Sequence, residues 1–343
     1  MGCMFCVPKK DKAKAQILLD EARHYDPSQT DVLGYTKLGF VKPGIDSVEV
    51  DVGFTYLLSQ SFPKWLVNVI DKLSSTGFKQ NPNEEKYEEH TVDILDARKR
   101  DLRFEDAGFT LVSMNEPSKT TDWRSKNDVK KFQEEIRPEL LRLHPGATRV
   151  EFTYSVVRGG NKLGDQPAAV NMAHLDYFQD DQARVEFHEE YPVNEKVTEH
   201  LALLGRWDTE EDEVRAMIGI WKPINMKNPV YDHPFAMMDA RTFHPENEVQ
   251  QPVHFDIGLF KLHNLNGAFT YHEGQRWYYY SNQVETEVAV FTHYSKGKHF
   301  ANPHTSFLNP NRPIDSSEYD SRQSVEMRAA VFFPKEVTST VAH

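Results

Sequence analysis

The sequence predicts one mainly β domain, with a sandwich or barrel-like core that is buttressed by helices. Two observations lead to this fold class. Segments in the N-terminal portion carry apolar residues at helical spacing, and most of the remaining chain consists of short β-branched or aromatic runs. Loops rich in Asn, Pro, Gly and Asp separate these runs. Such a pattern favours a sheet core with helices packed against it.

Four segments show the spacing of an amphipathic helix. They are residues 11–25, 61–75, 128–143 and 194–204. Pro138 lies inside the third segment, where a proline removes a backbone donor and clashes with the preceding turn. We therefore expect that helix to be kinked or interrupted at Pro138.

Seven short runs read as strands, because they are rich in β-branched and aromatic residues. They are residues 148–157, 168–173, 216–221, 235–239, 276–281, 287–294 and 324–333. Neither an internal repeat nor a convincing linker divides the 343 residues. We therefore expect one structural unit with a sizeable buried core.

The composition excludes several classes of protein. The formal net charge is −12, whereas nucleic-acid binding needs clustered Lys and Arg, so we expect no nucleic-acid partner. No apolar run approaches the roughly 20 residues that span a bilayer, and the first residues do not resemble a secretory signal. We expect no membrane partner.

The two cysteines, Cys3 and Cys6, both lie near the N-terminus, which excludes a disulfide framework and favours the cytoplasm. Lipidation at Gly2-Cys3 and metal binding by Cys-x-x-Cys are alternative readings. Against them, position 6 lacks the preferred Ser or Thr, and a second ligand pair is missing. A homodimer is a reasonable expectation for a cytosolic protein.

His174-x-Asp176 is the first chemically informative motif. Residues i and i+2 of a strand point to the same side, so an imidazole and a carboxylate can meet at one point. A third ligand from a distant strand, for which His304 is the candidate, would complete two histidines and one carboxylate. That set suits Fe(II) and leaves adjacent positions open. The rival pair is His254-x-Asp256, whose flanks look like loop-edge sequence and favour a surface pair.

Arg322-x-Ser324 opens the last predicted strand, so these two residues share a face. The planar guanidinium binds a carboxylate with two hydrogen bonds, and the Ser324 hydroxyl can add another. The alternative is a surface ion pair of Arg322 with Glu318, Asp320 or Glu326. Arg328, further along the same face, is the competing anchor.

Taken together, these motifs and their neighbours resemble the iron(II)/2-oxoglutarate-dependent oxygenases, in the group of CmcJ-like and AsaB-like proteins related to fungal gibberellin desaturase. The resemblance covers about residues 88–333 and rests on the order and spacing of many blocks. These are residues 90–98, 107–112, 145–147, 157–158, 170–177, 219–224, 238–242, 275–279, 287–291, 303–307 and 322–333.

The resemblance implies a double-stranded β-helix, or jelly-roll, core, which we expect at residues 88–343. Residues 1–87 are poorly covered by the resemblance, and we expect them to form a helical or irregular extension packed on the core. The resemblance implies that His174, Asp176 and His304 are iron ligands, and it argues against His254 as a ligand. It also implies that Arg322, with Ser324, holds the distal carboxylate of 2-oxoglutarate. Weaker candidates for the substrate pocket are Trp221, Trp277, Tyr177 and Phe178. For each tryptophan, the simpler interpretation is an aromatic residue of the core.

The expected function is oxidation of an unactivated C–H bond of a small specialised-metabolism intermediate, with Fe(II), 2-oxoglutarate and O₂ as cofactors and succinate and carbon dioxide as co-products. Hydroxylation, desaturation, ring closure and endoperoxide formation stay open as outcomes. The alternatives are a metal-dependent dioxygenase or isomerase of similar fold that does not use 2-oxoglutarate, and a non-catalytic partner subunit. The distal arginine argues against the first, and the complete ligand set argues against the second.

Overall fold

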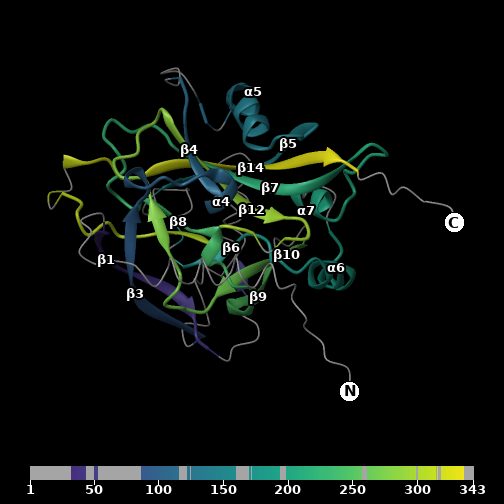
Figure 1. The fold of residues 1–343 in the computed structure, drawn as a ribbon, viewed down its shortest axis with the longest axis horizontal. Coiled ribbons are helices and arrows are strands. Elements are labelled where there is room, and N and C mark those ends of the chain that lie inside the picture. The colour runs from purple at the N-terminus through teal and green to yellow at the C-terminus, as the bar shows by residue number, and fades with distance from the viewer. Residues whose placement is uncertain are drawn as a thin grey trace, which may run out of the picture.

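Two sheets form the core of the computed structural model. It describes residues 32–43, 50–52, 86–115, 122–123, 125–159, 170, 172–193, 198–256, 261–298, 300–313, 315 and 318–335. In Figure 1 the smaller sheet runs across the middle of the molecule, with helix α5 above it and the larger sheet below. The predicted mainly β fold with helical buttresses is confirmed.

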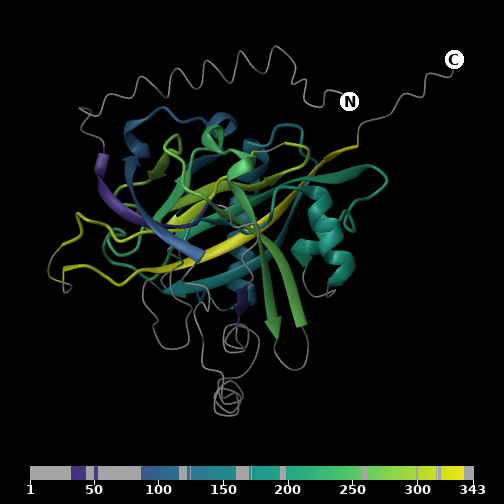
Figure 2. The ribbon, with the colours of Figure 1, turned by 90° about the horizontal axis from the view of Figure 1, so that it is seen from below.

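The larger sheet has nine strands, in the order β1-β3-β11-β8-β13-β6-β10-β9-β2. Their bounds, in that order, are Val32–Val41, Tyr87–Asp96, Trp277–Tyr279, Phe235–Met238, His304–Ser306, His174–Leu175, Lys261–Phe269, Glu248–Asp256 and Val50–Val52. Strands β6 and β13 are very short and lie side by side in its centre. Figure 2 shows the β9–β10 hairpin, in green, extending away from the rest of the sheet.

The smaller sheet has five antiparallel strands, in the order β4-β12-β7-β14-β5. Their bounds are Phe109–Ser113, Glu287–Ser295, Asp212–Pro223, Gln323–Pro334 and Arg149–Gly159. Along β14 the side chains alternate between two faces. Val325, Met327 and Val331 belong to the apolar cluster under α5, so Arg322, Ser324 and the residues in step with them face the other sheet.

Helix α5, Lys126–Leu143, covers the outer face of the smaller sheet. Ser125 caps its N-terminus by accepting a hydrogen bond from the backbone N–H of Asp128. The helix is continuous through Pro138, so the predicted interruption is wrong. Ile136 and Leu140, on either side of the proline, are fully buried against the sheet, and this packing offsets the missing backbone hydrogen bond.

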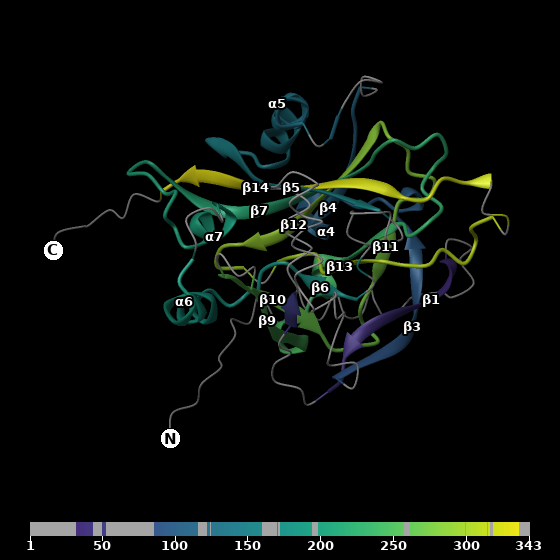
Figure 3. The same cartoon turned by 180° about the vertical axis from the view of Figure 1, so that it is seen from behind.

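The remaining helices in the described part of the chain are short. They are α4 Phe104–Ala107, α6 Asp181–Glu190 and α7 Thr198–Leu203, with 3₁₀ turns at Ala97–Lys99, Ala240–Thr242 and Pro245–Asn247. Figure 3 shows α6 and α7 together at one end, opposite β1 and β3. Among the described residues, no helix is both long enough and apolar enough to cross a membrane.

The N-terminal segment differs from the expectation where it can be described. The helices expected at residues 11–25 and 61–75 lie outside the described residues, as does half of the strand expected at 168–173. Its described residues, 170, 172 and 173, precede β6 and are not part of a named strand. Within residues 1–87, strand β1 pairs antiparallel with β3 and extends the larger sheet. That strand was not predicted from the sequence, and neither was α6.

Candidate metal centre

His174, Asp176 and His304 come together where β6 and β13 pair. His304 lies directly opposite His174 in the antiparallel register, and their ring centroids are 4.4 Å apart. Asp176 follows two residues after His174, and its Oδ2 lies 3.7 Å from Nε2 of His304. One ligand atom from each of the three residues can be chosen so that all lie within 4.8 Å of one another. The structure thus brings together the three residues that the sequence singled out.

Backbone carbonyls orient both imidazoles. Nδ1 of His174 lies 2.8 Å from the Met172 carbonyl oxygen, and Nδ1 of His304 lies 3.2 Å from the Asn302 carbonyl oxygen. In each case Nδ1–H donates to a carbonyl two residues earlier, so the lone pair lies on Nε2. This is the orientation that a metal-binding histidine requires.

Burial and charge put the ligands in the protonation states that bind a metal. Burial lowers the pKa of His304 to about 3, which keeps its imidazole neutral. For Asp176, burial alone would raise the pKa, but the nearby Arg328 guanidinium and the surrounding imidazoles hold the pKa below its usual range. The carboxylate is therefore ionised. Its buried Oδ2 has no hydrogen-bond partner among the described residues, as expected for an atom that bonds to a cation.

A second group of three, Asp176, His293 and Glu326, overlaps the first. It is fully enclosed, and Nη2 of Arg328 lies 3.1 Å from Asp176 and 3.5 Å from Glu326. A guanidinium already neutralises this group, so a second cation would meet strong repulsion. The first group, in which His174 is partly exposed, is the better candidate for a reactive metal.

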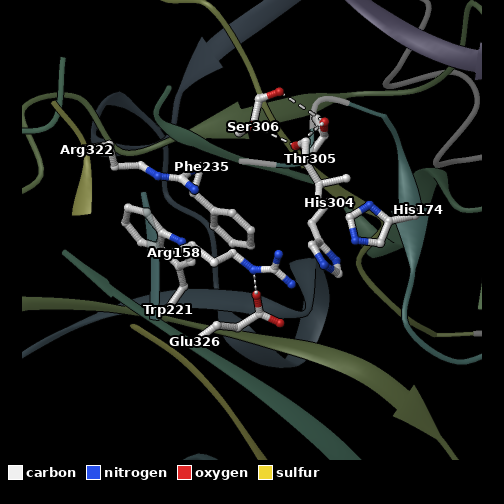
Figure 4. A pocket seen from close by; sticks show the side chains of 10 residues that line it. Arg158, His174, Trp221, Phe235, His304, Thr305, Ser306, Arg322 and Glu326 are labelled. Atoms are coloured by element: carbon white, nitrogen blue, oxygen red, sulfur yellow. Dashed lines mark hydrogen bonds and ion pairs between the residues drawn. The ribbon is translucent and has the colours of Figure 1, made fainter. Parts of the chain in front are cut away.

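A cavity with an empty volume of about 310 Å³ lies beside the first group. Figure 4 shows His174 and His304 on one side of it and the side chain of Arg322 on the other. Trp221 and Phe235 also line it, with their rings stacked at 5.3 Å and an interplanar angle of 6°. The cavity therefore joins the candidate metal ligands to a buried guanidinium.

Arg322 is only 2% exposed. Its Nη1 donates to the His233 carbonyl oxygen at 2.9 Å, and its guanidinium lies 5.7 Å from the Trp221 ring centroid. Burial, and the nearby Arg158, lower the pKa of Arg322 to about 9, a condition that a bound anion would relieve. Its Nε has no hydrogen-bond partner among the described residues, so a donor is available for a ligand.

The other sequence candidates lie in different surroundings. Ser324 is fully buried, and its Oγ has no hydrogen-bond partner among the described residues, although it does not belong to the described lining of the cavity. Arg328, the competing anchor, pairs with Asp176 and does not line the cavity either.

Among the aromatic candidates, Trp221 lines the cavity, whereas Trp277, Tyr177 and Phe178 are not part of its described lining. Trp277 packs in an apolar cluster with Leu38. Tyr177 is fully buried in the cluster with Phe332. For Trp277 the simpler reading, a core aromatic, matches its surroundings.

His254 does not join the centre. It lies in β9 opposite His263 of β10, and the two Nδ1 atoms are 2.6 Å apart. Because the flanking residues form a nine-residue strand pair, the expectation of loop-edge sequence around His254 is wrong. Cross-strand pairing overrides the polar, proline-containing composition that suggested a loop.

Sequence reasoning missed Arg158 and His293, and it treated Glu326 only as a partner of Arg322. Arg158 lines the cavity and pairs with Glu326 at 3.4 Å. His293 is completely buried, with Nδ1 3.4 Å from Oδ2 of Asp176. The alternation of side chains between the two faces of a strand could have indicated two of them, since His293 and Glu326 lie at inward-facing positions of predicted strands.

Comparison with known proteins identifies the class. A family model described as "Oxidoreductase/YMDC permease-like domain" matches residues 56–332, most of the chain, and the chain belongs to this family. It is 26% identical over 261 residues to alpha-ketoglutarate-dependent dioxygenase phiK of a fungal species (strain ATCC 74256), covering 71% of this chain and 84% of the relative. It is 30% identical over 131 residues to Fe(II)/2-oxoglutarate-dependent dioxygenase nvfI of Aspergillus novofumigatus, covering 36% of this chain and 44% of the relative.

Solved structures share the fold. One is the iron and alpha-ketoglutarate-dependent endoperoxidase NvfI, with a TM-score of 0.59 at 21% identity, covering 88% of this chain and 98% of the neighbour. A second structure of NvfI in a different conformation gives 0.60 at 20% identity, covering 90% and 100%. The predicted jelly-roll core and the predicted resemblance to fungal iron(II)/2-oxoglutarate oxygenases are both confirmed.

Proposed function

We propose that this protein is an Fe(II)/2-oxoglutarate-dependent dioxygenase in which His174, Asp176 and His304 bind the iron. Arg322, assisted by Ser324, is assigned to the distal carboxylate of 2-oxoglutarate. The observation that supports the proposal is the shared cavity. The imidazoles of His174 and His304 lie across it from the buried Arg322, whose Nε has no hydrogen-bond partner among the described residues.

The residues present fit both groups. Two imidazoles and one ionised carboxylate are a donor set typical of non-haem Fe(II), and the buried Oδ2 of Asp176 needs a cation. Arg322 matches the planar geometry of a carboxylate, while the stacked Trp221 and Phe235 form an apolar wall that keeps water away. When bound, Fe(II) and 2-oxoglutarate supply the oxidising power from O₂, with release of succinate and carbon dioxide.

In this arrangement the protein orients the metal ligands and the keto acid, and it partly neutralises the charge of the metal ion. Asp176 contributes the one negative charge of the proposed ligand set, and the carbonyls of Met172 and Asn302 hold the two imidazole rings in place. Arg322 fixes the far end of the keto acid, which determines where its reactive end lies.

We assign a small specialised-metabolism intermediate as the substrate, in keeping with the fungal relatives, and oxidation of an unactivated C–H bond as the reaction. Hydroxylation, desaturation, ring closure and endoperoxide formation, the last being the activity named for NvfI, are the candidate outcomes. A cytoplasmic location, a homodimer and the division of the chain at residues 87 and 88 stay predictions from the sequence.

An anaerobic titration of the purified protein with Fe(II) and 2-oxoglutarate tests the proposal. We expect a saturable visible charge-transfer band, because a keto acid chelated to Fe(II) absorbs in the visible range. His174→Ala should abolish the band, and His254→Ala, which removes an imidazole outside the centre, should leave it unchanged. If the wild type binds iron tightly without this band, the assignment of 2-oxoglutarate is wrong. A band that survives His174→Ala and disappears in His254→Ala would overturn the ligand assignment.

A further inference from the structure

Arg328 lies at the centre of a buried group of charges behind the candidate metal centre. Its Nη2 lies 3.1 Å from Oδ1 of Asp176 and 3.5 Å from Oε1 of Glu326, and its Nη1 lies 3.6 Å from Oε1 of Glu199. All four side chains are nine-tenths or more buried. One guanidinium thus serves three carboxylates inside the protein, and nothing in the proposed binding of iron or keto acid has yet used it.

The two oxygens of Asp176 are in different surroundings. Oδ1 faces the Arg328 guanidinium, whereas Oδ2 has no hydrogen-bond partner among the described residues and lies 3.7 Å from Nε2 of His304. A guanidinium N–H at this distance occupies the oxygen that it faces. Oδ1 also lies 3.9 Å from Nε2 of His174, so both oxygens are near the imidazoles. The guanidinium competes with a metal ion for Oδ1 and leaves Oδ2 as the oxygen without a hydrogen-bond partner among the described residues.

We infer that Arg328 is a positioning residue that holds Oδ1 of Asp176 and so presents Oδ2 alone to the metal ion. The inference rests on the proposed function, because it concerns the iron ligand Asp176. A carboxylate that binds through one oxygen takes one coordination position. A carboxylate that binds through both takes two, and thereby removes a position that a chelating keto acid and O₂ need.

The geometry explains why the residue is an arginine. The two terminal nitrogens of the fork face different partners, Nη2 toward Asp176 and Glu326, and Nη1 toward Glu199. A lysine at this position carries the same charge on one nitrogen and cannot span both sides. The Arg328 guanidinium also lies 5.6 Å from the ring centroid of Tyr177, the residue directly after Asp176.

Arg322 directly precedes β14, and Arg328 lies within that strand six residues further along. Arg322 lines the cavity, whereas Arg328 lies behind the ligand Asp176. Arg322→Gln is therefore a matched control, because it removes another buried guanidinium from the same segment of the chain without touching Asp176.

Metal binding measured without any keto acid tests this inference. Apo-protein is titrated with Co(II) against a competing chelator, and the visible ligand-field spectrum of the cobalt form is recorded. We expect Arg328→Gln to weaken Co(II) binding by about 10- to 100-fold, the usual effect of removing the partner of a metal ligand. The spectrum should change because the carboxylate coordinates differently. Arg322→Gln should leave both readouts as in the wild type.

Loss of Arg328 removes the guanidinium that faces Asp176 and Glu199 and leaves Glu326 with Arg158, so Arg328→Gln can fail to fold. Two further variants cover that case. Arg328→Lys keeps the charge, and Arg328→Gln combined with Glu199→Gln removes one of the carboxylates as well. We expect both to fold, by circular dichroism, and to show weakened Co(II) binding with an altered spectrum. If either folded variant binds Co(II) as the wild type does with the same spectrum, the inference is overturned.

The outcomes separate this inference from the proposed function. If the wild type binds Co(II) and shows no keto-acid band with Fe(II), the dioxygenase assignment fails, and Arg328 is still judged by the cobalt titration. If the wild type shows the band and the Arg328 variants bind Co(II) normally, only the positioning role fails. If the wild type binds neither metal, both fail.

Discussion

Gly219 offers a sharp test of how the interior is packed, because a single methyl group added there meets two buried rings. It lies in β7, paired with Phe291 of β12 on one side and with Arg328 of β14 on the other. A Cβ at this position would lie 2.2 Å from Cζ of Phe291 and 2.6 Å from Nε2 of His293. Both distances are shorter than real Cβ contacts, and both rings are fully buried, so neither can move aside into solvent.

The expected cost of Gly219→Ala follows from these contacts. Displacing each ring from a close-packed site costs about 1–3 kcal/mol, whereas replacing glycine by alanine in a strand returns about 0.5–1 kcal/mol. For two rings, we therefore expect the free energy of unfolding to fall by about 1–5 kcal/mol. The His293 ring would also shift relative to Asp176, from which its Nδ1 is only 3.4 Å away, so metal binding should weaken as well.

Urea denaturation of the apo-protein gives the stability, and the cobalt titration gives the second readout. Gly146→Ala is the control. Its φ is +88° with no atom within 4 Å of the added Cβ, so it reports backbone strain alone, about 1–2 kcal/mol. A Gly219→Ala protein that is as stable as the wild type, or more stable than Gly146→Ala, would refute the packing argument.

Three further predictions address the cavity, the sheet and the rival histidine. Arg322→Ala should weaken 2-oxoglutarate binding by about 10- to 1000-fold and leave the Fe(II) affinity unchanged, since charge-assisted hydrogen bonds of about 1.5–3 kcal/mol each are lost. Anaerobic titration measures the two affinities separately, and a larger effect on iron than on the keto acid would argue against the role of Arg322 in binding the distal carboxylate. Asp212 accepts hydrogen bonds from Arg149, which lower its pKa to about 2, so Asp212→Asn should reduce stability near neutral pH. A carboxyl group whose pKa is lower in the folded state stabilises the fold at pH values above its unfolded pKa, and this stabilisation is lost as the pH falls through the folded pKa. The difference in stability between wild type and Asp212→Asn should therefore shrink between about pH 4 and pH 2, which chemical denaturation across that range measures. A difference that stays constant would contradict the role of the charge. His254→Ala should leave Fe(II) affinity at the wild-type value, and a loss of iron in that variant would contradict the placement of the centre.

Local patterns predicted the parts of the site that depend on periodicity alone. The alternation of a strand is a property of the backbone, so the common face of Arg322 and Ser324 could be read from the sequence, as could the pairing of His174 with Asp176 across one intervening residue. The same reasoning identified the helix under which β14 packs. It failed at Pro138, because burial on both sides of the proline stabilises a helix that its own residues would interrupt.

Residues far apart in the chain could be assigned to one site only by resemblance. His304 meets His174 because β13 pairs with β6, although 129 residues of chain separate the two histidines. Arg328 was a plausible anchor from its position on β14, and only the three-dimensional arrangement shows that its guanidinium lies against Asp176 and not in the cavity. The β9–β10 pairing likewise turned an apparent loop around His254 into a strand.

The sequence by itself determined the mainly β character of the chain, the chemical types in the candidate site and the alternation of side chains along the last strand. Those properties depend on side-chain chemistry and on the two-residue period of an extended backbone. Only the tertiary structure decided which faces meet, that Arg158 and Arg322 line the cavity while Arg328 lies against Asp176, and that Gly219 leaves room for His293. These depend on long-range strand pairing and close packing, where contacts between distant residues outweigh local preference.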